Sequence, residues 1–179
     1  AVECALELLE RHSVDAVVSA SRHAETARGE KSLVALANGQ EPSPTDFTMS
    51  VHNAASGVLT IFKKLHVPVT SVAAEANTFE AALFEATAFL QDGKKSVLLI
   101  DYENILPEIL GSRLPPIQEA FAVAMIMQKG TTLTAVAENR HEKEPDTVDV
   151  LQFLKGVLRP ESSFTVRSGS RLWTWRKAS

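Results

Sequence analysis

The sequence is poor in cysteine and in long apolar runs, and both shortages narrow the class of protein. Cys4 is the only cysteine among 179 residues, which excludes an internal disulfide framework and favours a reducing compartment, the cytoplasm. The longest apolar runs, residues 97–100 and 121–127, are far shorter than the roughly 20 residues of a membrane-spanning helix, so no membrane insertion is expected. Because the chain opens on Ala1 directly before a helical pattern, we expect its native start to lie upstream.

Metal-binding and phosphate-binding patterns are missing as well. The five histidines show no pairing at i and i+4, and the lone cysteine has no neighbour at ligand spacing, so no metal site is predicted. The eight glycines are scattered and form no phosphate loop, so no nucleotide or other cofactor is predicted. A net charge of -4 argues against a nucleic-acid-binding protein. A small basic cluster is interpreted as solvated surface and comprises Arg167, Arg171, Arg176 and Lys177.

Hydrophobic periodicity predicts an alternation of helices and strands within one domain. Helices are predicted at residues 2–12, 25–37, 52–65, 79–90 and 146–158. Strands are predicted at residues 14–20, 69–74, 97–100 and 119–128, with 131–138 as hairpin partner of 119–128 and a last hairpin of 163–167 with 171–175. The proline-containing segments 40–46 and 107–116 are predicted to be loops. Strands separated by such helices predict an α/β fold with a mixed, mainly parallel sheet and helices on both faces.

The turn formed by Ala74, Glu75, Ala76 and Asn77 joins a predicted strand to a helix N-terminus. The helix dipole and the free amides there favour negative charge, so a cysteine at this turn would have a lowered thiol pKa and become nucleophilic. Neither Ala76 nor Asn77 offers a nucleophilic group, so no covalent acyl intermediate is expected. Glu75 is interpreted as a cap rather than a general base, and Asn77 with Glu80 as a capping box.

Motifs on both sides of this turn resemble the N-terminal half of β-ketoacyl synthases. Those enzymes carry an S-P loop, an Asn near a helix start, a G-P-x-x-S-I strand and then the active cysteine. The same order and spacing occurs here at Ser43-Pro44, Asn53, Gly57, Pro68 and Ser71. The closest likeness is to the short chain length factors of aryl polyene clusters, and it covers residues 15–128. Counting along the pattern puts Ala76 at the nucleophile position. Chain length factors typically show Glu-Gln there, so Glu75 agrees with them and Ala76 departs.

The resemblance implies a thiolase-like half-fold with a truncated second half. It divides the single domain of residues 1–179 into an N-terminal thiolase-type half, 1–128, and a shortened C-terminal remnant, 129–179. Ketosynthases take two catalytic histidines from H-G-T-G-T and G-H contexts, and neither context occurs in this sequence. Half of a layered sheet would leave apolar surface uncovered, so a partner subunit is expected to cover it.

By the same resemblance, two groups of residues are expected to face the partner. The interface strand, expected to make one sheet continuous across the dimer, comprises Val69, Ser71, Val72, Ala73 and Ala74. The second group is expected to reach the partner's acyl tunnel and comprises Thr45, Asp46, Phe47 and Met49. The helix 25–36 is expected to bound the far end of that tunnel. Asp46 stands where homodimeric ketosynthases often carry a gating aromatic. The alternative is that Asp46 and Thr45 cap the following segment.

These implications give one functional hypothesis and two alternatives. The chain is expected to be a non-catalytic chain length factor that pairs with an active β-ketoacyl synthase, shapes its acyl tunnel and meets an acyl carrier protein in aryl polyene or polyketide-type biosynthesis. The first alternative is a degenerate acyl-processing enzyme that uses Glu75 or His52 as acid or base. The second is a homodimeric scaffold that docks an acidic carrier protein through Lys63, Lys64 and the C-terminal arginines.

Overall fold

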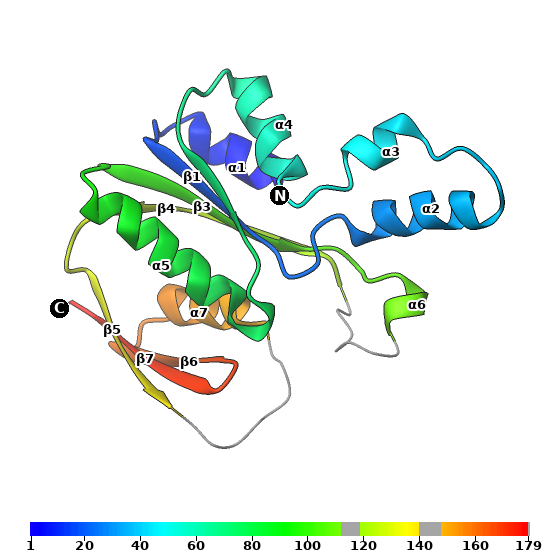
Figure 1. Ribbon diagram of the computed structural model, residues 1–179. Coiled ribbons are helices and arrows are strands. Elements are labelled where there is room, and N and C mark those ends of the chain that lie inside the picture. The colour runs from blue at the N-terminus through cyan, green and yellow to red at the C-terminus, as the bar shows by residue number, and fades with distance from the viewer. Residues whose placement is uncertain (112–118, 140–147, 179) are drawn as a thin grey trace.

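A four-stranded sheet forms the centre of the molecule. The computed structural model describes residues 1–111, 119–139 and 148–178 (Figure 1). Its main sheet has the strand order β2-β1-β3-β4, with β1 at Ala16–Ala20, β2 at Val69–Val72, β3 at Ser96–Glu103 and β4 at Phe121–Gln128. β1 runs parallel to both β2 and β3, whereas β4 is antiparallel to β3. The predicted mixed, mainly parallel sheet is therefore confirmed, and β2 lies at its edge.

Helices cover both faces of this sheet, as predicted. Every residue of β3 is buried, so alternate side chains enter two separate cores. Leu98 and Ile100 pack with the helices α1 (Val2–Leu9) and α4 (Ala54–Lys63). Val97 and Leu99 pack with α5 (Thr78–Gln91) and α7 (Asp149–Leu158) on the opposite face. In the described part of the chain, no helix has the length and apolar character needed to cross a bilayer.

A second, smaller sheet lies beyond α5 and α7. Its strands β5 (Leu133–Asn139), β7 (Arg171–Lys177) and β6 (Ser163–Ser168) are all antiparallel, in the order β5-β7-β6. Apolar side chains of this sheet join the same core as α5 and α7, so the two helices lie between the two sheets (Figure 1). We call β5, α7, β6 and β7 the C-terminal module.

The predicted partner of β5 is wrong. Residues 131–138 were expected to form a hairpin with β4, but β5 pairs with β7, with Val136 opposite Thr174. The turn at Lys129 and Gly130 is compatible with either path. Burial decides between them, because Leu133 joins the core that contains α5, α7 and the β7 tryptophans. The predicted hairpin of β6 and β7 is confirmed, and Gly169 at its turn has a left-handed φ of 53°.

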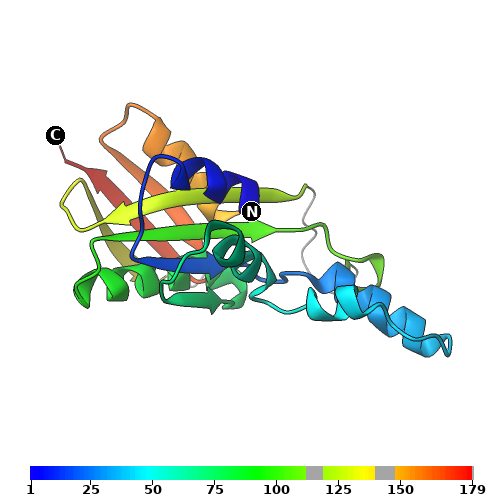
Figure 2. The ribbon, with the colours of Figure 1, turned by 90° about the horizontal axis from the view of Figure 1, so that it is seen from above.

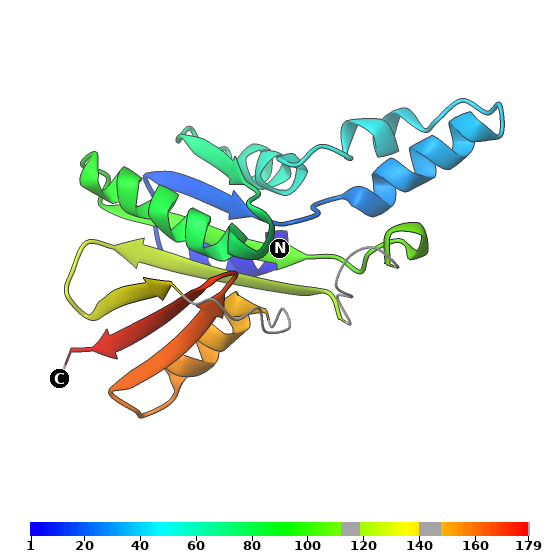
Figure 3. The same ribbon diagram turned by 60° about the horizontal axis from the view of Figure 1, so that its bottom comes forward.

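Two helices form an arm that extends away from the sheets (Figures 2 and 3). These are α2 (Thr26–Ala37) and α3 (Pro44–Thr48), joined by a turn in which Gly39 has a φ of 69°. The segment 40–46 was predicted to be a loop, which is wrong for its last residues. α3 begins at Pro44 because the Ser43 side chain accepts the Asp46 N–H at 3.3 Å and proline suits the first helical position.

A short helix also lies in the second predicted loop. α6 (Glu108–Gly111) falls within the segment 107–116, and residues 112–116 of that segment lie outside the described residues.

Candidate functional site: an elbow without a nucleophile

The turn between β2 and α5 has the shape of a nucleophile elbow. A single-turn 3-10 helix, η1 (Glu75–Asn77), joins the strand to the helix, and Glu75 has a left-handed φ of 49°. The Thr78 hydroxyl accepts the Ala74 N–H at 3.0 Å and donates to the Glu75 carbonyl oxygen at 2.8 Å. These two hydrogen bonds hold a conformation that is costly for a non-glycine residue, as in strained strand-to-helix turns that carry nucleophiles.

No side chain at this elbow can attack an acyl group as a thiolate would. The positive φ falls on Glu75, one residue before the counted nucleophile position at Ala76. Glu75 presents an exposed carboxylate, and Ala76 presents only a methyl group. The Thr78 hydroxyl is buried and already takes part in two backbone hydrogen bonds. Whichever of Glu75 or Ala76 is taken as the nucleophile position, the thiol is missing.

The predicted capping box at the start of α5 is wrong. Asn77 occupies the N-cap position, but its side chain makes no capping hydrogen bond. Glu80 is buried and accepts hydrogen bonds from Arg171 and, at 3.1 Å, from the Trp173 indole N–H. Two side-chain donors on β7 thus take the place of the backbone amide, and they fasten α5 to the second sheet.

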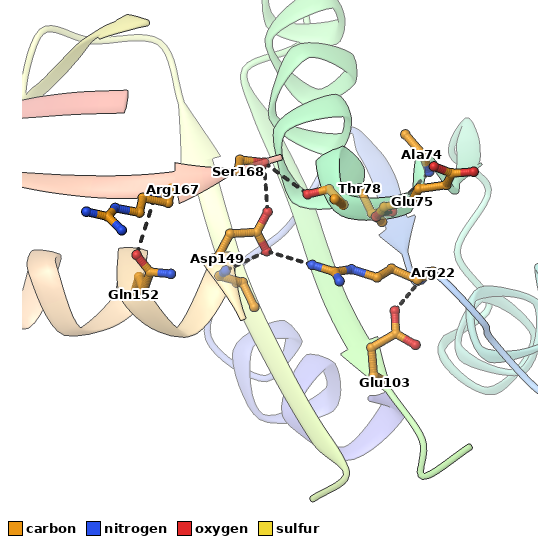
Figure 4. A network of polar contacts seen from close by, with 11 residues as sticks. Arg22, Ala74, Glu75, Thr78, Glu103, Asp149, Gln152, Arg167 and Ser168 are labelled. Carbon is orange, nitrogen blue, oxygen red and sulfur yellow. Dashed lines mark hydrogen bonds and ion pairs between the residues drawn. The ribbon is translucent and has the colours of Figure 1, made fainter. Parts of the chain in front are cut away.

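The C-terminal module braces the elbow from behind (Figure 4). The Ser168 hydroxyl at the end of β6 lies 3.2 Å from the Ala76 carbonyl oxygen and 3.0 Å from Oδ2 of Asp149 in the first turn of α7. Beside it, Gly169 lies so close to Asn77 that an added Cβ would be 2.3 Å from the Asn77 amide oxygen, and the Asn77 side chain would have to move to admit one. This bracing could not be predicted from local sequence patterns, because about 90 residues separate Ser168 from Ala76.

A group of buried acidic residues lies next to the elbow. Glu103 accepts the backbone N–H of Arg22, and the Arg22 guanidinium lies 4.0 Å from Asp149 (Figure 4). Together with Asp101 and Thr78, these residues line a cavity of about 20 Å³, roughly the size of one water molecule. The sequence offered no signal for this group, because its members come from the ends of β1, β3 and α7.

Two of these acids, Asp101 and Asp149, have a raised pKa. Burial raises the pKa of Asp101 well above its ordinary value, and the Asp149 and Glu103 carboxylates raise it further, with Arg22 opposing them. Burial also raises the pKa of Asp149 to about 6, against the lowering effects of Arg22 and the Ser168 hydrogen bond. The group can therefore hold a proton behind the elbow, but it presents no reactive atom to the outer side of the turn.

The expected tunnel residues lie together on the arm. Thr45 and Phe47 are exposed on α3, and Phe47 is 67% exposed. Asp46 and Met49 are half-buried, and the Asp46 carboxylate pairs with the Arg28 guanidinium of α2 at 2.9 Å. The alternative capping role is wrong for Asp46, because Ser43 supplies the side-chain cap. The tunnel role of these residues stays a prediction.

The expected interface strand has an open edge. The Val17 and Ser21 N–H groups of the β1 segment bond to the carbonyl oxygens of Pro68 and Val72 at 3.0 and 3.2 Å. Because parallel ladders use alternate residues, the backbone groups of Val69 and Ser71 point away from β1, toward the open edge. The Ser71 hydroxyl is buried without a hydrogen-bond partner in the described part of the chain. Ala73 is exposed and Ala74 half-buried at the end of this strand.

Exposed apolar side chains gather on the elements beside this edge. We call the run from α2 to β2, residues 26–72, the α2–β2 side, and Figure 3 shows its elements following one another along one margin of the molecule. Nine of the fourteen large apolar residues found exposed in the described chain belong to it, namely Leu33, Val34, Leu36, Phe47, Val51, Val58, Ile61, Phe62 and Val69. A concentration of this kind is typical of a protein–protein contact surface.

Residues proposed for the two alternative functions, His52 and the C-terminal basic cluster, already take part in contacts within the chain. His52 has Nε2 2.8 Å from the Ser21 carbonyl oxygen, so this nitrogen acts as a donor and is not available as a base. For the scaffold alternative, the basic cluster near the C-terminus is partly occupied. Arg171 pairs with Glu80, and Lys177 donates to the Arg159 carbonyl oxygen.

The family of this chain follows from a comparison with known protein families. Residues 1–176 match the family described as "Beta-ketoacyl synthase, N-terminal domain". The chain belongs to this family. The resemblance noted in the sequence of this ketosynthase-family chain ended at residue 128. The family match extends well past that residue and includes the C-terminal module.

A solved structure is similar to this ketosynthase-family chain over nearly its whole length. A chain of the complex of the ketosynthase ApeO with its chain length factor ApeC, from Xenorhabdus doucetiae, is 38% identical to it. The alignment covers 99% of this chain and 75% of that chain, with a TM-score of 0.94. This likeness confirms the expected thiolase-like, ketosynthase-type fold. Among curated proteins, none matches.

Proposed function

We propose that this chain is a non-catalytic chain length factor that pairs with an active β-ketoacyl synthase in aryl polyene-type biosynthesis. The observation that carries the proposal is the elbow itself. The strained backbone at Glu75 and the start of α5 at Thr78 are kept, while a methyl group stands at Ala76. A family member that keeps the elbow but lacks the thiol can contribute structure to a condensing enzyme without forming the acyl intermediate.

The open edge of β2 supports pairing with a partner strand. Val69 and Ser71 direct backbone groups to that edge that pair with none of the residues the structure describes, and an exposed edge of this kind is a ready template for another strand. The exposed apolar residues of the α2–β2 side flank the same edge. We infer that the partner ketosynthase covers this side, with Val69, Ser71, Val72, Ala73 and Ala74 at the contact.

The arm is the element best suited to shaping an acyl tunnel. It carries Thr45, Asp46, Phe47 and Met49 on or next to α3, and its only described ion pair between helices joins Arg28 to Asp46. In this proposal the partner supplies the cysteine and histidines for decarboxylative condensation of a malonyl unit, and an acyl carrier protein delivers the substrate in the cytoplasm. Residues 1–128 supply the interface, and residues 129–179 brace the elbow.

Co-expression with an active ketosynthase from the same source tests this function. We expect the two chains to co-purify as a heterodimer that condenses malonyl and acyl carrier thioesters, and we expect this chain alone to produce nothing. Glu75→Gln in this chain should leave turnover of the complex within about twofold of the unaltered complex, because the chemistry belongs to the partner. Changing the partner's nucleophilic cysteine to alanine should abolish turnover.

Two results would contradict the proposal. One is condensation or thioester hydrolysis by this chain alone that is lost in the Glu75→Gln variant, which would favour a degenerate enzyme. The other is a homodimer that ignores the ketosynthase but binds the carrier protein, which would favour the scaffold.

A further inference from the structure

A large cavity lies along the C-terminal part of α5, away from the elbow at its start. Its volume is about 560 Å³, and its walls come from α5, β4, the β4–β5 turn, β5, α7 and β7. Since α5 has 14 residues, its two ends are about 20 Å apart at 1.5 Å per residue. The cavity is therefore separate from the elbow. Its wall in the main sheet is β4, at the opposite edge from β2, so the cavity is also separate from the proposed partner-facing edge.

The lining of this cavity suits a flexible apolar chain. Its volume falls in the range of small-molecule sites, about 300 to 1,000 Å³. Apolar side chains make up most of the wall, and Met125 and Met127 can adapt their shape to an occupant. Trp175 also lines it, and its indole N–H is buried without a hydrogen-bond partner among the described residues. The wall thus offers adaptable apolar surface to an occupant.

A second, more open cavity continues from the first and is basic. It has a volume of about 430 Å³ and shares Leu90, Gln91, Gln128 and Lys129 with the larger one. Gly93, Lys94 and Lys95 complete its wall, so three lysines line the second cavity, and one of them, Lys129, also lines the first. Asp15 is near these lysines but accepts the backbone N–H groups of Lys95 and Ser96, and it does not line the cavity.

We propose that the two contiguous cavities bind a long-chain carboxylate. The hydrocarbon chain lies among the apolar side chains of the larger cavity, and the carboxylate lies against Lys94, Lys95 and Lys129. The division into one apolar chamber and one cationic chamber carries the inference, because an uncharged hydrocarbon would leave the lysines unused and a small anion would leave the apolar chamber empty. This site is independent of the proposed subunit role.

Photolabelling of the full chain with decanoate that bears a diazirine at its chain end locates the site directly. We expect mass spectrometry to find the label on α5, β4, β5 or α7 facing the cavity. Calorimetric titration should give decanoate an affinity at least about tenfold higher than that of decanol, which has the same chain length and no charge.

Two variants separate the contributions of charge and volume. Lys129→Glu reverses one charge at an exposed position and should weaken decanoate binding about tenfold or more. Lys31→Glu changes the net charge equally on exposed α2 and should leave binding unaltered. Thr87→Trp, at an exposed position that also lines the cavity, should block the chain of both decanoate and decanol without disturbing the fold, which circular dichroism checks.

Four results would overturn the site. They are labels found on α2, α3 or β2, equal affinity for decanoate and decanol, equal effects of Lys129→Glu and Lys31→Glu, or no saturable binding of decanoate. The heterodimer with the ketosynthase should show the same labels on this chain, so failure of the site and failure of the proposed subunit role give different results.

Discussion

The α2–β2 side and the C-terminal module handle apolar residues in opposite ways. On the α2–β2 side, side chains such as Phe47 and Ile61 remain exposed, although Leu59 between them in the chain is fully buried. In the C-terminal module, aromatic side chains turn inward, and the described strand positions that face outward, such as Thr165 and Arg167, are mostly polar. The contrast shows that the module packs its apolar side chains within the chain, whereas the α2–β2 side keeps apolar side chains exposed, and we propose that a partner covers them.

The inward packing of the module is centred on Phe153. Its ring lies 5.3 Å from Phe79 of α5 and 4.9 Å from Trp175 of β7, measured between centroids. Phe164 of β6 completes the group at 5.9 Å from Phe153. Tilted and edge-on aromatic contacts at these distances add to the energy of burial, so one side chain links three elements to the core.

The largest expected effect is on stability, and it contrasts matched phenylalanines. Phe153→Ala should lower the free energy of unfolding by about 3 to 5 kcal/mol, because it leaves a cavity among rings that cannot fully collapse. Phe47→Ala on the arm should change it by less than about 0.5 kcal/mol, because that ring is 67% exposed. Urea unfolding of both variants measures this, and a similar loss in the two would remove the contrast.

The second prediction concerns the open edge of β2. Ser71→Pro removes an N–H that faces the open edge and should weaken association with the ketosynthase about 100-fold while the chain stays folded. Thr70→Pro removes an N–H that faces β1 and should instead destabilise the fold by about 3 kcal/mol. Sizing and titration of the complex, with urea unfolding of each chain, distinguish the two. Unchanged association of the Ser71→Pro chain would exclude strand pairing at this edge.

The third prediction concerns the pH dependence that the module imposes through Asp149. The pKa of Asp149 is raised to about 6 in the folded chain from 3.8, so the folded state holds the proton more tightly than the unfolded state between these values. Its contribution to stability is therefore present at low pH and is lost as pH rises through about 6. Asp149→Asn should flatten this fall, measured by urea unfolding between about pH 4.5 and pH 7.5.

Asp15 provides a control, because its pKa is shifted in the opposite direction to that of Asp149. Backbone hydrogen bonds from Lys95 and Ser96 lower the pKa of this exposed carboxylate below 3.8, so its contribution is lost as pH falls. Asp15→Asn should leave the slope above about pH 5 unchanged. An unaltered slope in Asp149→Asn would show that Asp101, whose pKa is also raised, dominates the titration.

Local patterns in the sequence were sufficient to predict most helices and strands, and the succession of strand, turn and helix that forms the elbow. The apolar run at residues 97–100 predicted a strand, and the apolar spacing over residues 79–90 predicted a helix. The first lies within β3 and the second within α5. The missing thiol at Ala76 was also readable, because it depends only on residue identity. Predictions failed where a choice depended on distant partners, as for β5, which buries Leu133 against the module rather than pairing with β4.

The surroundings of the elbow could not be predicted for the same reason. Glu80 has the spacing of a capping residue, yet it bonds to Arg171 and Trp173 about 90 residues away. Ser168 and Asp149 meet the elbow only because α7 and β6 fold back on α5. No local pattern encodes such contacts, so the missing thiol was readable from residue identity, whereas the groups that hold the elbow in place were not.

The last prediction concerns Asp46 on the arm, where only a small effect on stability is expected. Breaking its half-exposed ion pair with Arg28 should cost less than about 1 kcal/mol, so Asp46→Ala and Asp46→Phe should both fold. If residue 46 lines the acyl tunnel, the small side chain should lengthen the products of the complex and the aromatic one should shorten them, as measured by mass spectrometry. Arg28→Gln breaks the same ion pair without changing the size of residue 46. The tunnel role would be removed if product lengths changed in Arg28→Gln as they do in the Asp46 variants, or if they stayed constant in all variants. Asp46→Ala and Asp46→Phe both lose the ion pair, so a difference between their products reports the size of residue 46.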